Sequence, residues 1–243
     1  DELDLVFHLG DYIYEYIAGN QGNIRKHHGK EIVTLSEYRV RHAQYKMDAS
    51  LQKMHARCPW FVTWDDHEVD NNCADEISEQ KNVKPVDFLI RRAAAYQAYY
   101  ENMPLRRTSL PAGPDLQLYR RGAFGQLAEF TVHDGRQYRS DQPNNDVRSP
   151  LNEAALNPET TMLGAKQRNW LKQTLIESRG TWNVLAQQVM MGMVGMPSGD
   201  VPMAYSMDQW PGYTHERMAL LRFMADRKIS NPVILTGGIR SNW

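Results

Sequence analysis

Five short apolar runs, each ending in polar residues or glycine, constrain the fold of this 243-residue chain more than any other feature. Runs of this length and composition are typical of strands that are covered on both faces. Segments with apolar residues at helical spacing lie between them, and this alternation predicts a layered α/β domain. The runs are Val6 to Leu9, Phe61 to Trp64, Ala128 to His133, Val184 to Gln188 and Val233 to Thr236.

The helices are predicted from cap residues and apolar spacing. Thr34 or Ser36 is suited to cap a helix that continues to Met47. Three further segments fit the same template: Val86 to Met103, Leu163 to Ile176 and Glu216 to Ala225. Segments rich in Gly, Pro and Asn predict long loops. These are Gly19 to Gly29, Leu110 to Pro114, Gln142 to Pro158 and Met196 to Gly212.

Composition and charge narrow the class of protein. A hydrophobic content of 42% provides a core, which excludes intrinsic disorder. With a formal net charge of -1, the protein has no overall positive charge to attract it to nucleic acid or anionic membranes. The sequence does not reveal the oligomeric state. The longest apolar stretch is interrupted by Gln187 and Gln188, so no transmembrane helix is predicted. Because the chain starts and stops beside strand-like runs, we expect residues 1–243 to be one partial domain, truncated at both ends.

The first polar motif follows the first predicted strand. In His8-Leu9-Gly10-Asp11-Tyr12-Ile13-Tyr14-Glu15-Tyr16, a glycine allows a tight turn before a carboxylate and a phenol. Carboxylate oxygens bind hard cations and a phenolate binds ferric iron, so Asp11 and Tyr14 are candidate metal ligands. The alternative is that Asp11 caps a turn while the tyrosines pack in the core.

The second motif is denser, because all but one of the eight positions from Asp65 to Asn72 can bind a metal or exchange a proton. Four neighbouring carboxylates repel one another unless cations or hydrogen-bond donors compensate them. A metal site is one interpretation, and a solvated acidic loop is the other. The nearby Trp60 and Trp64 favour a place beside the core.

Two further motifs also follow predicted strands. In His133-Asp134-Gly135-Arg136-Gln137-Tyr138-Arg139, either arginine could bind a phosphoryl oxygen, or it could link loop carboxylates. The last strand opens into Thr236-Gly237-Gly238, a glycine turn that permits close approach to the backbone.

Together these motifs resemble the PhoD family of alkaline phosphatases, within the calcineurin-like metallophosphoesterase class. The match runs over nearly the whole chain in the family's order. The residues that carry it are His8 to Tyr16, Thr63 to Asn72, Arg136 to Asp141, Thr236-Gly237, Ile239 and Ser241 to Trp243.

The resemblance implies a four-layer α/β/β/α sandwich with iron and calcium at the carboxyl ends of the strands. It implies that Asp11 bridges metals and that Tyr14 binds iron. Asp66 would be a further ligand, and His67 would act on the phosphate.

The resemblance also implies that Asn71 or Asn72 adds an amide ligand and that Arg136 steadies a phosphoryl oxygen. The implied reaction is hydrolysis of phosphate mono- or diesters. An extracytoplasmic location, periplasmic or secreted, is implied in the same way.

Departures from the family pattern predict impaired chemistry. Gly238 and Arg240 stand where the family has an aspartate and a histidine, and Gly135 replaces a threonine. The family's upstream segment, which carries a cysteine ligand to iron, precedes the region seen here. Loss of a carboxylate and gain of a cationic Arg240 predict weak metal binding and slow hydrolysis.

Two rival functions stay open at this stage. One is a catalytically degenerate homologue that binds phosphate ligands without turnover. The other is a metal-free hydrolase in which Asp65 and Glu68 act as an acid and base pair.

Overall fold

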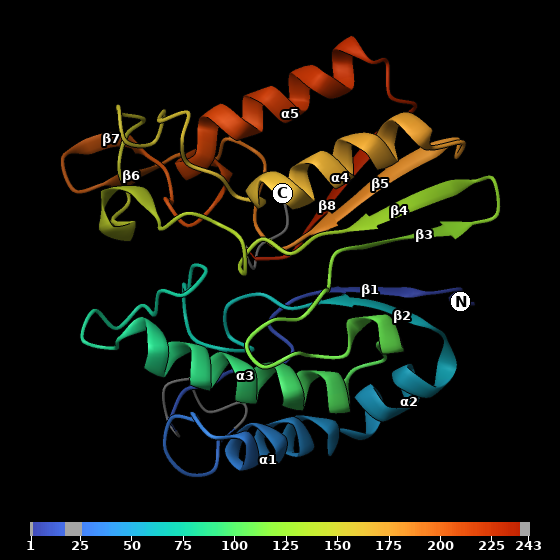
Figure 1. The fold of residues 1–243 in the computed structure, drawn as a ribbon, viewed down its shortest axis with the longest axis vertical. Helices are drawn as coiled ribbons and strands as arrows, with labels where there is room; N and C mark the ends of the chain where they lie inside the picture. The colour runs from blue at the N-terminus through green and yellow to red at the C-terminus, as the bar shows by residue number, and fades with distance from the viewer. Residues whose placement is uncertain (1, 18–25, 239–243) are drawn as a thin grey trace. The chain divides into compact units, whose positions relative to one another are not determined.

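The computed structural model describes residues 2–17 and 26–238. The chain divides into two compact units, Asp1–Leu118 and Tyr119–Trp243 (Figure 1). Each unit combines helices with strands, so the predicted α/β class is confirmed. The predicted single domain over 1–243 stays a prediction.

The first unit is built on a pair of parallel strands, β1 (Val6–Leu9) and β2 (Trp60–Thr63). The crossover between them contains α1 (Leu35–Lys46) and α2 (Ala49–Arg57), and α3 (Pro85–Asn102) follows β2. All three helices lie on the same face of the strand pair (Figure 1). The carboxyl ends of the two strands therefore reach the same edge, since the strands are parallel.

Local sequence signals explain where the helices of this unit begin. Thr34 caps α1 in a capping box, because its hydroxyl accepts from the Glu37 backbone while the Glu37 carboxylate accepts from the Thr34 backbone at 2.9 Å. This resolves the predicted choice between Thr34 and Ser36. Asp48 caps α2, a helix of only nine residues that was not predicted from the sequence.

Aromatic side chains form the core of the first unit. Trp64 stacks on Tyr96 with ring centroids 4.1 Å apart, and its edge meets Tyr99. Phe88 of α3 and Val62 of β2 are fully buried in the same cluster. Because Trp64 comes directly after β2, this packing fixes the point from which the acidic motif leaves the sheet.

The second unit contains a four-stranded sheet in the order β3-β4-β5-β8. The strands are β3 (Arg120–Phe124), β4 (Ala128–Val132), β5 (Trp182–Gln187) and β8 (Pro232–Thr236). β3 is antiparallel to β4, and the remaining pairs are parallel. The crossovers contain α4 (Gly164–Glu177) and α5 (Thr214–Asp226), which lie on one face of the sheet (Figure 1).

The five predicted strands and four predicted helices are present, with ends that shift by one or two residues. The sequence analysis missed β3 because its Arg-Arg-Gly start lacks an apolar run.

The prediction of a loop over Met196 to Gly212 was wrong in part. This segment forms the hairpin of β6 (Met196–Ser198) and β7 (Val201–Ala204), followed by a short 3-10 helix, η3 (Trp210–Tyr213). Two further 3-10 helices are η1 (Arg107–Ser109) and η2 (Pro143–Asp146), and η2 lies within the predicted loop Gln142 to Pro158. Part of the predicted loop at Gly19 to Gly29 lies outside the described residues.

Within the part of the chain that the structure describes, no helix is long and apolar enough to cross a bilayer.

Candidate metal centre

The turn after β1 places a carboxylate at the edge of the first unit's sheet. Gly10 has a φ of 109°, and a Cβ added there would lie 2.4 Å from the Cβ of Asp65. Only a glycine allows this close approach of the two strand ends. Asp11 follows in the left-handed region, with a φ of 59°.

The acidic segment after β2 is buried. Each side chain from Asp65 to Asp70 belongs to a residue no more than 5% exposed. The interpretation as a solvated loop was therefore wrong, because Trp64 draws the segment into the core. Carboxylates buried at this density need compensating donors or cations.

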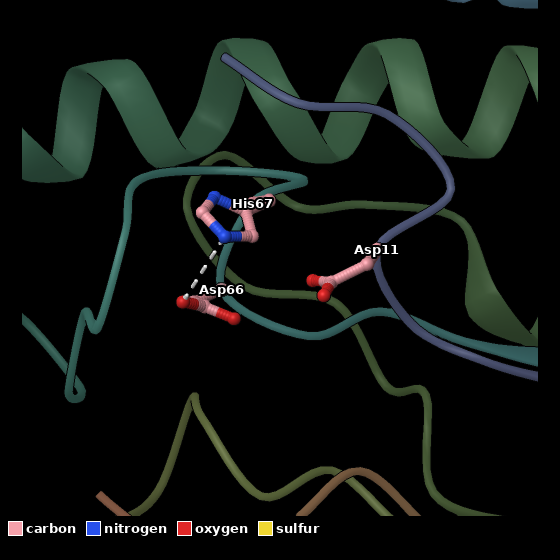
Figure 2. A group of neighbouring side chains, drawn as sticks. All are labelled: Asp11, Asp66 and His67. Atoms are coloured by element: carbon pink, nitrogen blue, oxygen red, sulfur yellow. Dashed lines mark ion pairs between the residues drawn. The ribbon is translucent and has the colours of Figure 1, made fainter. Parts of the chain in front are cut away.

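Asp11, Asp66 and His67 converge at this edge. Each offers a ligand atom, and these atoms all lie within 4.8 Å of one another. Figure 2 shows the Asp11 side chain, from the turn after β1, pointing toward Asp66 and His67 of the segment after β2. Two carboxylates and one imidazole are donors that suit calcium through oxygen and iron through oxygen and nitrogen.

Tyr14 lies beside the same group. Its hydroxyl donates to Oδ2 of Asp11 at 3.1 Å, and its ring centroid is 4.3 Å from that of His67. The sequence predicted Asp11, Tyr14, Asp66 and His67 as site residues, and the structure brings these four together.

Glu15 fixes the imidazole of His67. Nδ1 of His67 lies 2.8 Å from Oε2 of Glu15, and Nε2 faces Oδ2 of Asp66 at 3.9 Å. Burial acts to lower the pKa of His67, but the hydrogen bond to Glu15 and the charges of Asp66, Glu15 and Asp11 outweigh it and raise the pKa to about 9. The carboxylates thus create a strongly negative environment around this ring.

The two asparagines occupy different positions. The Asn71 side chain donates to Glu79 at 2.7 Å, and its backbone donates to Glu15 at 2.9 Å. The Asn72 backbone donates to Oδ2 of Asp66 at 2.8 Å. Asn71 is thus hydrogen-bonded to Glu15 and Glu79, and Asn72 to Asp66, while an amide ligand from either asparagine stays a prediction.

Glu68 accepts three backbone hydrogen bonds. They come from Asp11 at 3.1 Å, Tyr12 at 2.5 Å and Asp65 at 2.8 Å. Burial, followed by the charge of Asp11, raises the pKa of Glu68, and the three N–H groups oppose that shift. This engagement with the backbone is unlike the free acid and base expected of an Asp65–Glu68 catalytic pair.

A buried ion pair with α3 stabilises the end of the acidic segment. Arg91 of α3 lies 3.0 Å from Oδ1 of Asp70, and Ser78 donates to Oδ2 of Asp70 at 2.5 Å. Burial raises the pKa of Asp70 to about 6, although Arg91 acts in the opposite direction. Tyr38 donates to the carbonyl of Val69 and accepts from Arg91 at 2.9 Å. These contacts hold the carboxyl end of the segment against α1 and α3.

Arg136 of the second unit forms a bidentate pair with Asp208. The two nitrogen–oxygen distances are 2.7 and 2.8 Å. Arg139 lies 3.1 Å from the same carboxylate, and Gln142 donates to it at 2.8 Å. Burial acts to raise the pKa of Asp208, but the two guanidinium groups hold it well below its usual range. The alternative in which these arginines link a loop carboxylate is present, and contact of Arg136 with phosphate stays a prediction.

The departures from the family pattern fall partly within the described residues. The backbone N–H of Gly238 donates to the Gln188 carbonyl at 2.6 Å, next to that of Gly237 at 2.8 Å. Gly135 donates to the Gln188 side chain at 3.1 Å. Arg240 lies outside the described residues.

Sequence reasoning missed the partners of the predicted residues. Glu15 is 52 positions from His67, and Asp208 is 72 positions from Arg136. The sequence contains a weak signal for Glu15, because this carboxylate stands in the same motif as Asp11, four residues further along. Asp208 lies in a predicted loop and gave no signal.

Comparisons with known proteins identify relatives over the whole chain. The family model for PhoD-like phosphatases matches residues 1–243. Alkaline phosphatase D of Bacillus subtilis (strain 168) is 51% identical over 247 residues, which cover 100% of this chain and 42% of that protein. The solved structure of PhoD matches with a TM-score of 0.94 and 50% identity, over 100% of this chain and 47% of that one. The chain thus spans less than half the length of these relatives.

Proposed function

The chain belongs to the PhoD-like phosphatase family, and from this premise we propose that it forms part of a metal-dependent hydrolase of phosphate mono- or diesters. The observation that carries the proposal is the convergence of Asp11, Asp66 and His67 within 4.8 Å. The proposed cofactors are calcium and iron, which suit carboxylate, phenol and imidazole donors.

In this proposal Asp11, Tyr14 and Asp66 hold the metals, with Asn71 or Asn72 as a further ligand. When bound, the metals supply positive charge that polarises the ester and makes water a better nucleophile. His67, oriented by Glu15, donates a proton toward a phosphoryl or leaving oxygen from Nε2. Arg136 steadies a non-bridging oxygen.

The finer features of the family are proposed on the same premise. Each unit contains a sheet with parallel strands and helices on one of its faces, the parts that a four-layer α/β/β/α sandwich requires. We also propose an extracytoplasmic location, which the relationship to alkaline phosphatase D supports. The substrate is a phosphate ester.

The experiment is to compare wild type and Asp66→Asn in the whole protein. Asn retains the oxygen that accepts from Asn72 but loses the charge that attracts a cation. We expect the metal content to fall and the hydrolysis of a chromogenic phosphodiester to drop by at least about 100-fold. Asp226→Asn, at an exposed carboxylate in the last turn of α5, is the control and should leave both unchanged.

Chelation separates this proposal from its rivals. EDTA should abolish hydrolysis by wild type, and calcium with iron should restore it. Hydrolysis that resists EDTA would favour a metal-free mechanism. Binding of phosphate esters without turnover, whatever metal is added, would favour a degenerate phosphate-binding homologue.

A further inference from the structure

We propose that Glu68 is a positioning residue that holds the turn carrying Asp11 against the segment carrying Asp66. This inference rests on the proposed function, because it gives Glu68 a purpose at a metal site. Glu68 would act through the backbone of its neighbours.

The hydrogen bonds of Glu68 connect the ends of two strands. Oε2 accepts from the Asp11 N–H at 3.1 Å and from the Asp65 N–H at 2.8 Å, while Oε1 accepts from the Tyr12 N–H at 2.5 Å. Two of these donors follow β1 and one follows β2. The carboxylate is 1% exposed, so water does not readily replace these bonds.

The turn needs such support because its backbone is strained. Asp11 has a φ of 59°, a conformation that non-glycine residues adopt at a cost. Gly10 brings the turn so close to Asp65 that even a methyl group would collide. Because a strained conformation persists only when its surroundings enforce it, the bonds from Glu68 to residues 11 and 12 determine where the Asp11 side chain points.

A carboxylate suits this role and an amide does not. Both oxygens of Glu68 accept from backbone N–H groups, and these contacts favour the ionised form against burial, because an ionised carboxylate accepts at both oxygens. In Glu68→Gln the new NH₂ group must face at least one of these backbone N–H groups, which replaces a hydrogen bond with a repulsive contact. The turn after β1 would then lose at least part of its attachment.

A matched control exists in the second unit. Glu216 of α5 is 3% exposed, and its Oε2 accepts from the backbone of Met162 at 2.5 Å and Leu163 at 3.4 Å. It also accepts from the Thr161 hydroxyl at 2.8 Å. Its other oxygen, Oε1, lies 3.1 Å from Arg168. Glu216→Gln therefore removes the charge of an equally buried glutamate and weakens its pair with Arg168, without touching the Asp11, Asp66 and His67 group.

The experiment compares Glu68→Gln and Glu216→Gln in the whole protein after removal of metal. Calorimetric titration with calcium should show about 10- to 100-fold weaker binding for Glu68→Gln and unchanged binding for Glu216→Gln. Amide hydrogen exchange without metal should accelerate in peptides that contain Asp11 and Asp65 in the first variant. In the second it should accelerate only around Met162.

A shorter carboxylate separates positioning from charge. Glu68→Asp keeps the negative charge but loses reach, so its calcium affinity should also fall, by less than that of Glu68→Gln. Wild-type affinity in Glu68→Asp would show that charge alone matters and would overturn the inference. This variant also provides the test if Glu68→Gln does not fold.

The two proposals fail in different ways. Unchanged exchange at Asp11 and Asp65 in Glu68→Gln would overturn the positioning role even if wild type binds calcium and hydrolyses esters. Equal calcium affinity in Glu68→Gln and wild type would do the same. A wild type that binds neither calcium nor iron would overturn the proposed function and this inference with it.

Discussion

The polar segments after β2 and after β4 are both buried, but their charges are balanced differently. After β2, the imidazole of His67 faces the carboxylates of Glu15 and Asp66. After β4, two guanidinium groups, those of Arg136 and Arg139, face the carboxylate of Asp208. The first cluster gathers negative charge around the titratable ring of His67, and the permanent cation beside that segment, Arg91, pairs with Asp70 instead. The second cluster surrounds its carboxylate with permanent cations.

This difference separates a site suited to a cation from a structural ion pair. Buried carboxylates without permanent cations gain from a metal, since it supplies the missing charge. Asp208 gains little from a metal, because bidentate hydrogen bonds from Arg136 already satisfy both of its oxygens. The same type of residue at the same type of position therefore serves different purposes.

The largest expected effect is on the second cluster. Asp208→Asn leaves two buried arginines without their carboxylate and should lower the free energy of unfolding by about 3–5 kcal/mol. In metal-free protein, Asp66→Asn should change it by less than about 1 kcal/mol, since lost attraction to His67 is offset by relief from Asp11. Urea denaturation measures both. Equal losses of unfolding free energy in the two variants would contradict the proposed difference between the clusters.

A second prediction concerns the two departures from the family pattern at the C-terminal end of the chain. Gly238→Asp combined with Arg240→His restores the aspartate and histidine of the family pattern, and so adds a carboxylate and removes a cationic side chain. If these departures impair the site, the double variant should bind metal and hydrolyse a phosphodiester about 10- to 100-fold better. Metal analysis and initial rates provide the measurement. An unchanged metal content and rate would contradict the expected impairment.

The smallest effect concerns one buried histidine in each unit. Burial lowers the pKa of His42 from 6.5 to about 3, with a further contribution from Lys46, and burial alone lowers that of His133 to about 3. The unfolded state therefore binds more protons below pH 6.5, and stability decreases as the pH falls. Each histidine should cost about 1 kcal/mol between pH 7 and 5.5.

Substitution by phenylalanine distinguishes the two histidines. No described residue makes a hydrogen bond to either ring nitrogen of His42, so His42→Phe should remove its share of the acid sensitivity at little cost at pH 7. His133 Nε2 lies 3.1 Å from the Thr131 hydroxyl, so His133→Phe should cost about 1 kcal/mol at pH 7. Urea denaturation at both pH values tests this. An unaltered pH dependence in His42→Phe would refute the assignment.

Much of the fold could be predicted because its signals are local. The run from Val6 to Leu9 forms β1 with the predicted ends, and Thr34 caps α1 through a residue only three positions away. The missed elements lack such signals. β3 is a polar strand at one edge of its sheet, and α2 is a short helix of nine residues with no fully buried residue.

The order of residues is enough to identify the chemical groups that follow each strand: Asp11 and Tyr14 after the first, and the acidic segment from Asp65 after the second. The partner of each group depends on how the folded chain packs. Glu15 reaches His67 across 52 positions, and Asp208 reaches Arg136 across 72. Hydrogen bonds require atoms to approach within about 3 Å. Such proximity between distant residues arises from packing of the whole unit, which the local pattern of residues does not encode.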